Sequence, residues 1–473
     1  MVHYAFLTFS LPGHLTCMVT LAEKLIKVHP DLTVTIYTID AAADKCAPIK
    51  AMPGLNIVTL KLGPNGGNVK ELFTYSLEQP AQLADDVLLG IKNDLSSRAG
   101  VTYPSVAVSN QYGSTWGRQV AAKMGIKSYI FMPSPMIVWT VQMLLPQVYA
   151  SGFDRKGFLE VPHYGLLNHL QLLDMGGMVD GLAEQCRLAQ THDGMLINDQ
   201  EETYDSHYIA ALKEYIPNVR FIGYLPPATD FSKPPAPKQA QSTCPEVQGP
   251  ESLVLPWLDR QGPRSVIYIA MGSWVHLCKA DQVELAFALE KVGRPVVWTI
   301  KKYNETVPYR PSHAGKDYKE RECKVQCDEY GLPEGWLDRM GDRVLIVEWA
   351  PQTTILSHSS TGLFISHCGW NSLTECVSLG GIPIVGVPIF TDQPINAHML
   401  EHKLKIGKNL WSNPTEGELD RHLVADTIYE VMGNQVFAEN AAKLKRHNDR
   451  RWNGASGDSM KKLKEFCDEV ESK

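Results

Sequence analysis

Short β-rich apolar runs alternate with stretches of helical periodicity along most of this chain, and this alternation restricts the fold more than any other feature. Runs of this kind pair as parallel strands when helices connect them, because each crossover helix returns the chain to the same edge of the sheet. The chain is therefore predicted to be an α/β protein. The runs expected to form strands are residues 4–10, 33–39, 105–109, 128–132, 265–270, 295–300, 344–347, 362–366 and 382–387.

A proline-rich segment divides these runs into two groups. Residues 225–251 contain seven prolines and few large apolar side chains, a composition typical of an interdomain linker. The 473 residues leave room for two doubly wound domains of more than about 150 residues each. We expect a first domain over residues 1–240, a second over residues 252–440, and terminal helices over residues 441–473.

The last terminal helix is predicted from its own pattern. Residues 456–459 offer an N-cap, and apolar side chains then recur at helical spacing. An amphipathic helix of this kind needs an apolar surface to cover. Its apolar residues are Met460, Leu463, Phe466, Cys467 and Val470.

Composition and charge exclude several classes of protein. The net charge of −7, without a long basic run, makes nucleic acid an improbable partner. No run of 18 apolar residues and no N-terminal signal peptide is present, so we expect a cytoplasmic protein without an integral membrane segment. We also expect a monomer. The ten cysteines are scattered, as in a reducing compartment. Cys323 and Cys327 have no second pair at zinc-ligand spacing, so no metal site is expected.

His14 follows the first predicted strand and stands at the start of the first predicted helix. Ligands of open α/β sheets bind in the crevice at the carboxyl ends of the strands, so this position directs the imidazole toward a ligand. Imidazole is the side chain best suited to accept a proton near neutral pH. His14 is therefore a candidate general base, although a lone histidine at a strand end more often packs or caps.

A second strand end, in the segment FISHCGWNSLTE, collects polar donors. Two kinds of donor are expected to converge there: the free N–H groups at the start of the following helix, and the side chains of His367, Asn371 and Ser372. Together they would stabilise a phosphate group. An ordinary capped turn would carry some of the same residues. Trp349, after the preceding predicted strand, offers a face on which a base can stack, and Asp392 with Gln393 can bind sugar hydroxyl groups.

The whole stretch WAPQTTILSHSSTGLFISHCGWNSLTECVSLGGIPIVGVPIFTDQ, residues 349–393, resembles the signature box of the plant-type UDP-dependent glycosyltransferases of small molecules, family 1 of the glycosyltransferases. Weaker similarity extends to residues 12–14, 257–273 and 332–336. The resemblance implies the GT-B fold, which consists of two facing Rossmann-like domains. The first domain binds the acceptor, the second binds the UDP-sugar, and the last helix crosses back to the first domain.

The resemblance also implies roles for individual residues. Trp349 would stack on uracil, the Ala350 backbone would read its edge, and Gln352 and Glu375 would hold the ribose. The diphosphate would be bound by His367, Asn371, Ser372 and Ser273, and the sugar by Trp370, Asp392 and Gln393. Gln393 at the end of the box is associated with glucose donors. His14 becomes the general base, and UDP-glucose is a co-substrate, so no separate cofactor is implied.

One departure from the family pattern concerns the partner of this histidine. Relatives usually have an aspartate at the end of a strand of the first domain, hydrogen-bonded to the histidine. Residues 106–112, VAVSNQY, contain no acid, and either Asn110 or Gln111 occupies that position, with Asn110 closer in shape. An amide can orient an imidazole, but it cannot compensate the positive charge that forms on it.

The sequence therefore predicts an inverting UDP-sugar glycosyltransferase that acts on a small, largely apolar acceptor, phenolic or otherwise acidic. A weakly catalytic nucleotide-sugar-binding protein and a C-glycosyltransferase are the alternatives. A dinucleotide oxidoreductase is disfavoured because no G-x-G-x-x-G follows a candidate first strand. The apolar residues expected near the acceptor are Phe131, Met132, Met136, Trp139, Met143 and Met175, each of which could equally pack in the core.

Overall fold

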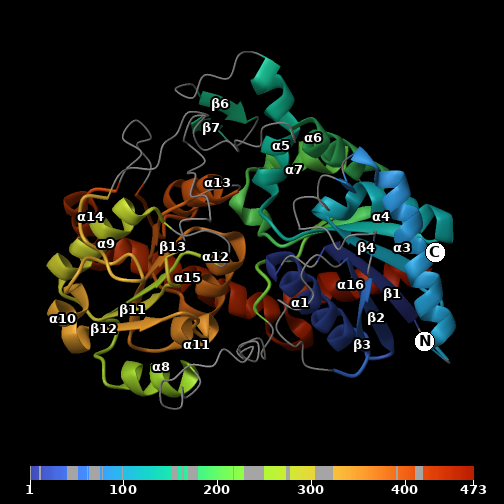
Figure 1. Cartoon of the computed structure of the whole chain (residues 1–473). Helices are drawn as coiled ribbons and strands as arrows, with labels where there is room; N and C mark the ends of the chain where they lie inside the picture. The colour runs from blue at the N-terminus through green and yellow to red at the C-terminus, as the bar shows by residue number, and fades with distance from the viewer. Residues whose placement is uncertain are drawn as a thin grey trace.

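A computed structural model of the chain describes most of the sequence. The described residues are 2–9, 12–39, 52–60, 62, 75–76, 78–98, 100–150, 158–161, 165–168, 179–216, 218–227, 250–272, 277–303, 323–389, 392–410 and 419–472. Two α/β halves lie side by side, the first built on a seven-stranded sheet and the second on a six-stranded sheet (Figure 1). None of the helices in this part of the chain combines the length and apolar composition that a membrane crossing requires.

The first sheet is parallel throughout and has the strand order β3-β2-β1-β4-β5-β8-β9. Successive side chains of a strand point to opposite faces. Tyr4 and Phe6 therefore join one core and Ala5 and Leu7 the other. The strands are β1 (Val2–Phe9), β2 (Leu32–Ile39), β3 (Leu55–Leu60), β4 (Val106–Asn110), β5 (Lys127–Met132), β8 (Gly194–Ile197) and β9 (Val219–Phe221).

Helices cover both faces of this sheet. Helix α1 lies on one face, and α3 and α4 lie on the other. Gly117 lets α4 approach β4 closely, because a Cβ atom there would meet the Ser109 hydroxyl at 1.9 Å. The helices of the first half are α1 (Pro12–Val28), α3 (Pro80–Ser97), α4 (Ser114–Met124), α5 (Met136–Ala150), α6 (Val179–Leu188) and α7 (Ser206–Tyr215), with a small hairpin of β6 (Phe158–Val161) and β7 (Gly165–Asn168).

The second sheet is also parallel, in the order β12-β11-β10-β13-β14-β15. Its strands are β10 (Val266–Ala270), β11 (Val296–Thr299), β12 (Val344–Val347), β13 (Thr361–Ser366), β14 (Ile384–Gly386) and β15 (Gly407–Asn409). Its helices are α8 (Pro250–Asp259), α9 (Lys279–Val292), α10 (Trp336–Met340), α11 (Gln352–Ser357), α12 (Trp370–Glu375), α13 (Gln393–His398) and α14 (Arg421–Gly433). One π-helical turn, Cys376–Gly380, continues α12, and another, Met399–Leu404, continues α13.

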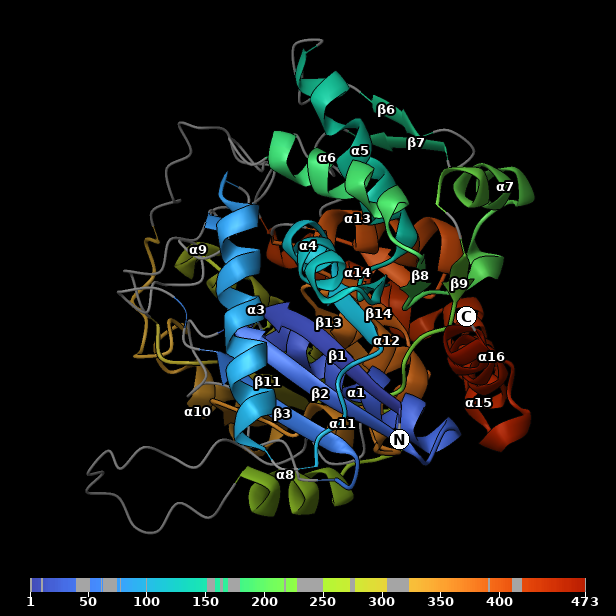
Figure 2. The ribbon, with the colours of Figure 1, turned by 90° about the vertical axis from the view of Figure 1, so that its right-hand side faces the viewer.

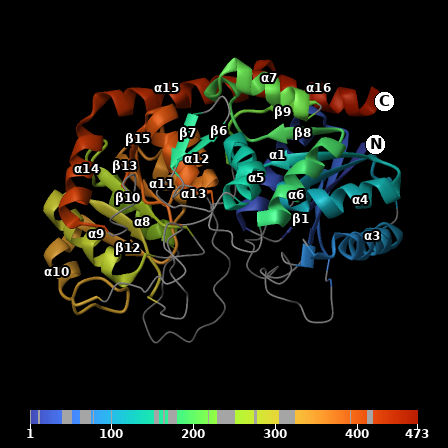
Figure 3. The ribbon, with the colours of Figure 1, turned by 90° about the horizontal axis from the view of Figure 1, so that it is seen from above.

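Two long helices tie the halves together. Helix α15 (Gln435–Trp452) begins on the second half, and α16 (Asp458–Ser472) ends on the first (Figure 3). The Asn448 amide of α15 donates to the Tyr224 carbonyl at 3.0 Å and to the Ser378 hydroxyl at 2.9 Å, one from each half. Helix α16 packs beside α1, along one edge of the molecule in Figure 2. The predicted return of the last helix to the first half is confirmed.

All nine predicted strands are confirmed within a few residues. Strands β3, β8, β9 and β15 and the β6–β7 hairpin had not been predicted. The middle of the proline-rich segment, residues 228–249, lies outside the described residues, as do residues 304–322.

Candidate active site

In both sheets the strand order reverses at a point where chemically active residues gather. In the first sheet, β1 and β4 are neighbours, and their connections leave on opposite sides. A crevice forms at such a switch point, at the carboxyl ends of the strands. His14 is the third residue of α1, just beyond β1, and Gln111 to Gly113 form a 3₁₀ turn just beyond β4.

His14 is half-buried in this crevice, and its ring lies against that of Tyr112, with 4.9 Å between the ring centres. Burial lowers the pKa of His14 to about 4, so the imidazole is neutral at neutral pH. No charged side chain among the described residues contributes to this shift, and the buried Nδ1 atom has no hydrogen-bond partner there. The pattern of the sequence had not identified Tyr112.

Asn110 is the last residue of β4 and is fully buried. Its Nδ2 atom donates to the Thr8 hydroxyl at 2.7 Å, and its Oδ1 atom accepts from the Gly113 N–H at 2.8 Å. Both ends of the amide are thus engaged by the first sheet and the turn that follows it. Within the described part of the chain, no carboxylate takes the place beside His14 that relatives fill with aspartate.

A small polar cavity lies behind Tyr112. Three glutamines line it, and the Gln185 amide donates to the Tyr112 carbonyl at 3.2 Å, while the Cys186 thiol lies 3.6 Å from the Gln142 carbonyl oxygen. Its lining residues are Gln111, Tyr112, Ser114, Ile130, Trp139, Gln142, Gln185 and Cys186.

Of the apolar residues expected near the acceptor, only Trp139 lines this cavity. Phe131, Met132 and Met136 are fully buried in the core, and Met143 packs against the core. Met175 lies outside the described residues. Within the described residues, the cavity behind Tyr112 is therefore lined by three glutamines and by only one of the apolar residues expected near the acceptor.

In the second half, the two residues predicted to hold ribose form one network. The Gln352 amide donates to the Glu375 carboxylate at 2.7 Å and lies 3.2 Å from the Ser372 hydroxyl. The Tyr268 hydroxyl donates to the Gln352 carbonyl at 3.3 Å, which fixes the orientation of that amide. Burial raises the pKa of Glu375 to about 7, although the bond from Gln352 acts in the opposite direction. A carboxylate held in this way can accept hydrogen bonds from two hydroxyl groups.

The turn between β13 and α12 places His367 between two glycines. A Cβ atom on Gly272 or Gly369 would lie 2.8 or 2.5 Å from the His367 Nε2 atom, so neither position tolerates a side chain without movement. Burial lowers the pKa of His367 to about 4, so this ring too is neutral at neutral pH. Cys368 adopts a left-handed backbone conformation, with φ of 63°, which a residue with a Cβ atom rarely adopts.

Asn396 was not identified from the sequence, although it stands four residues after Asp392 on the same side of α13. Its amide donates to the Cys368 carbonyl at 2.9 Å and to the Asp392 carboxylate at 2.8 Å. Gln393 is buried, and its carbonyl oxygen accepts from the Ile389 N–H at 2.8 Å. One buried amide therefore fixes both the strained turn and the predicted sugar-binding acid.

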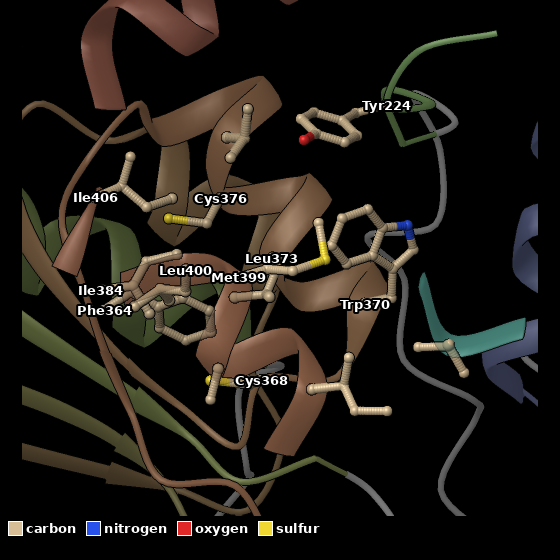
Figure 4. Close-up of a cluster of buried hydrophobic side chains, with 14 of the residues drawn as sticks. Tyr224, Phe364, Cys368, Trp370, Leu373, Cys376, Ile384, Met399, Leu400 and Ile406 are labelled. Carbon is tan, nitrogen blue, oxygen red and sulfur yellow. The ribbon is translucent and has the colours of Figure 1, made fainter. Parts of the chain in front are cut away.

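Trp370 lies at the boundary between the halves. Its indole N–H donates to the Asn198 carbonyl of the first half at 2.8 Å, and its ring makes an edge-on contact with Tyr224, with 5.4 Å between the ring centres (Figure 4). Only 4% of Trp370 is exposed. These contacts place the indole at the boundary between the halves, and the sugar contact expected for Trp370 stays a prediction.

Two more of the predicted residues, Trp349 and Ala350, lie just after β12 in the same sheet. Trp349 is half-buried directly after β12, and the buried Ala350 accepts from the Gln352 N–H at 2.9 Å through its carbonyl. Ser273 lies outside the described residues.

Across the boundary, Asn371 of α12 contacts the start of α1. Its Nδ2 atom donates to the Gly13 carbonyl at 2.8 Å, and its Oδ1 atom accepts from the Cys17 thiol at 2.9 Å. The predicted diphosphate site and the predicted base therefore lie side by side.

No cluster of three or more His, Cys, Asp or Glu side chains in the described ranges could hold a metal ion. Cys323 and Cys327, the pair considered from the sequence, lie with their sulfur atoms 3.8 Å apart.

Comparisons with known proteins identify similar sequences. The family model described as "UDP-glucoronosyl and UDP-glucosyl transferase" matches residues 240–453. UDP-glycosyltransferase 75B1 of Arabidopsis thaliana is 27% identical over 94% of this chain and 90% of its own length. The cinnamate beta-D-glucosyltransferase of Fragaria ananassa is 33% identical over 46% of this chain and 36% of its own length.

Solved structures share the fold. A UDP-glucose:anthocyanidin 3-O-glucosyltransferase in complex with UDP has a TM-score of 0.77 at 18% identity, with 100% of this chain and 99% of that chain covered. A transferase from Siraitia grosvenorii in complex with UDP has a TM-score of 0.76 at 23% identity, with both chains fully covered at 100%. The two facing parallel α/β halves are the GT-B fold.

Proposed function

Since the chain belongs to the plant-type UDP-dependent glycosyltransferases of small molecules, we propose that it transfers glucose from UDP-glucose to a small phenolic or otherwise acidic acceptor, with inversion at the anomeric carbon. One observation carries this proposal. The Asn371 amide on the donor side reaches the Gly13 carbonyl, next to His14, at 2.8 Å. A sugar attached to a diphosphate at Asn371 would thus lie close to the imidazole.

In the proposed donor complex, Trp349 and Ala350 bind uracil, and the Gln352–Glu375 pair binds the ribose hydroxyls. The diphosphate lies against His367, Asn371 and Ser372, with Ser273 on its other side. Trp370, Asp392 and Gln393 contact the glucose. The 2.7 Å Gln352–Glu375 bond supports the ribose assignment, because it holds the carboxylate in place before the ligand arrives.

The proposed reaction is a direct displacement. The neutral His14 imidazole accepts the proton of the acceptor hydroxyl, the acceptor oxygen forms a bond to C1 of glucose, and the bond from C1 to the UDP oxygen breaks. Donors at His367, Asn371 and Ser372 stabilise the negative charge that develops on the departing diphosphate. The low pKa of His14 keeps it unprotonated, and therefore able to act as a base, throughout the neutral range.

The surroundings of His14 favour acidic acceptors. Its pKa of about 4 makes it a weak base, and no carboxylate among the described residues stabilises the imidazolium. An acceptor that gives up its proton readily needs less help from the base. Phenols, enols and carboxylic acids meet this condition, and the cinnamate beta-D-glucosyltransferase among the relatives acts, by its name, on a carboxylic acid.

The test is a UDP-release assay with UDP-glucose across a panel of phenols, aromatic carboxylic acids and aliphatic alcohols. We expect release with phenols or acids, and a loss of about 10²–10⁴-fold in His14→Ala with UDP affinity retained. UDP binding without turnover on any acceptor would instead indicate a nucleotide-sugar-binding protein. A product that resists acid hydrolysis would indicate a C-glycosyltransferase, and preference for UDP-glucuronate over UDP-glucose would reject the sugar assignment.

A further inference from the structure

Cys17 lies one helical turn after His14, on the same side of α1. It is 6% exposed, and its thiol contacts the second half of the molecule rather than its own helix. The partner is the Oδ1 atom of Asn371, at 2.9 Å. Nothing in the sequence pattern had singled out this cysteine.

The two hydrogen bonds of Asn371 have different chemical requirements. A thiol donates a hydrogen bond and a backbone carbonyl accepts one, so the Cys17 thiol holds the oxygen end of the amide and the Gly13 carbonyl holds the nitrogen end. Flipping the amide would place two oxygen atoms against each other at Gly13. Cys17 and the Gly13 carbonyl together therefore fix which end of Asn371 faces the peptide that precedes His14.

The thiol keeps its proton under all working conditions. Burial, together with the nearby Glu375 carboxylate, raises the pKa of Cys17 to about 12, although the bond to Asn371 acts in the opposite direction. At neutral pH the group is thus a constant hydrogen-bond donor. Asn371 itself is half-exposed, and an amide nitrogen carries two N–H groups, of which the Gly13 carbonyl accepts from one.

We propose that Cys17 is a positioning residue: its thiol orients Asn371 so that one amide N–H holds the peptide beside His14 while the other faces the diphosphate of the donor. This rests on the proposed function. Through a single amide, the donor site and the base are then aligned with each other across the boundary between the halves. Removal of the thiol allows the amide to rotate. This rotation weakens the hydrogen bond from Asn371 to the diphosphate and also the hydrogen bond that holds the Gly13 peptide beside His14.

The experiment compares UDP with uridine, because uridine lacks the diphosphate. In Cys17→Ala we expect UDP affinity to fall about 3–10-fold, the usual effect of one lost hydrogen bond, with uridine affinity unchanged. The value of kcat with UDP-glucose should fall as well as kcat/KM. Cys17→Ser, whose hydroxyl can donate to the same oxygen, should restore both to within about twofold of the wild type.

Two controls separate this role from ordinary packing. Cys467→Ala removes another buried thiol of the first half, on α16, and should leave the UDP-to-uridine ratio unchanged. In an Asn371→Ala background, Cys17→Ala should have no further effect on UDP affinity, because the group that it orients is gone.

The proposal is overturned if Cys17→Ala weakens uridine as much as UDP, if Cys17→Ser behaves like Cys17→Ala, or if the effect persists in Asn371→Ala. If Cys17→Ala does not fold, Cys17→Val, which fills the same space but cannot donate a hydrogen bond, takes its place in each of these comparisons. A wild-type protein that fails to bind UDP at all contradicts the donor assignment itself, so that outcome is distinguishable from a failure of the Cys17 proposal.

Discussion

At the residue scale, the protonation of Glu375 should control nucleoside binding. Its pKa is raised to about 7 by burial, and the ribose hydroxyls would donate to its ionised form. We predict that uridine affinity falls as the pH decreases from 8 to 5.5, by up to about tenfold per pH unit below the pKa. Uridine is the ligand of choice because it has no phosphate that titrates in this range, and calorimetry measures the affinity.

Glu375→Gln is the matched control and should bind uridine with an affinity independent of pH. The same raised pKa affects folding: the folded state holds the Glu375 proton more tightly, so its contribution to stability is complete below the unfolded pKa and is lost as pH rises through about 7. A wild-type protein with constant uridine affinity from pH 8 to 5.5 would exclude Glu375 from the ribose site.

Restoring the acid that relatives possess is the second test at this scale. Asn110→Asp places a carboxylate at the end of β4, where Asn110 now bonds to Thr8 and Gly113. If this position can support His14, turnover of aliphatic alcohols should rise roughly tenfold or more, while phenols change within about twofold. UDP release on matched phenol and alcohol acceptors measures both rates. Equal wild-type rates on phenols and alcohols, unchanged by Asn110→Asp, would contradict the argument.

Individual contacts were predictable where one short segment supplies them. The Gln352–Glu375 pair belongs to one signature stretch, and the structure brings the two side chains to 2.7 Å. Tyr112 beside His14 was missed, as were Gln142 and Gln185 behind it, because their meeting depends on how α5 and α6 pack against the turn after β4. Helical spacing from Asp392 would have identified Asn396, a signal present in the sequence but not used.

At the scale of elements, the pattern from Met460 to Val470 predicted the amphipathic helix α16, but not what it would touch. The packing partner is a long-range property of the fold. Phe466 is fully buried between Tyr4 and Tyr129, with ring centres 6.2 and 4.9 Å away in edge-on geometry. Helix α16 therefore completes the core of the first half.

We predict that Phe466→Ala destabilises the protein by about 3–5 kcal/mol, the usual cost of removing a fully buried aromatic ring. Urea unfolding followed by fluorescence measures the change. Lys464→Ala, on the exposed side of the same helix, is the control and should stay within about 0.5 kcal/mol of the wild type. A loss below about 1 kcal/mol for Phe466→Ala would show that α16 is dispensable for the core.

At the scale of the whole molecule, the two halves are joined by specific polar bonds as well as by packing. Trp370→Phe keeps a ring against Tyr224 but removes the N–H that bonds to the Asn198 carbonyl. We predict a loss of about 1–3 kcal/mol in stability, because a buried carbonyl is left without its donor, and a weaker preference for UDP-glucose, because the smaller ring loses part of the proposed sugar contact. Thermal unfolding and donor competition give the two readouts.

An unchanged sugar preference would contradict the sugar contact proposed for Trp370, and unaltered stability would show that the bond to the Asn198 carbonyl is dispensable. The general arrangement of two facing halves followed from the strand alternation and the resemblance. The hydrogen bonds between the halves could not be predicted in this way. Asn198, Asn371 and Gly13 are far apart in the sequence, and no sequence pattern around them identifies their hydrogen-bond partners.

Because α16 is the last helix of the chain, the ribosome makes it only after both sheets have been synthesised. The last strand of the first half ends at Phe221, and the helix that covers this half begins only at Asp458, so 236 residues lie between them. At about 5–20 residues per second, a ribosome needs roughly 10–50 s to synthesise that interval. During this time the nascent first half exposes the apolar face that Phe466 later fills. The first half can therefore complete its core only after the second half has been synthesised. A chain whose translation stops before α16 is left with an exposed apolar face and is expected to aggregate.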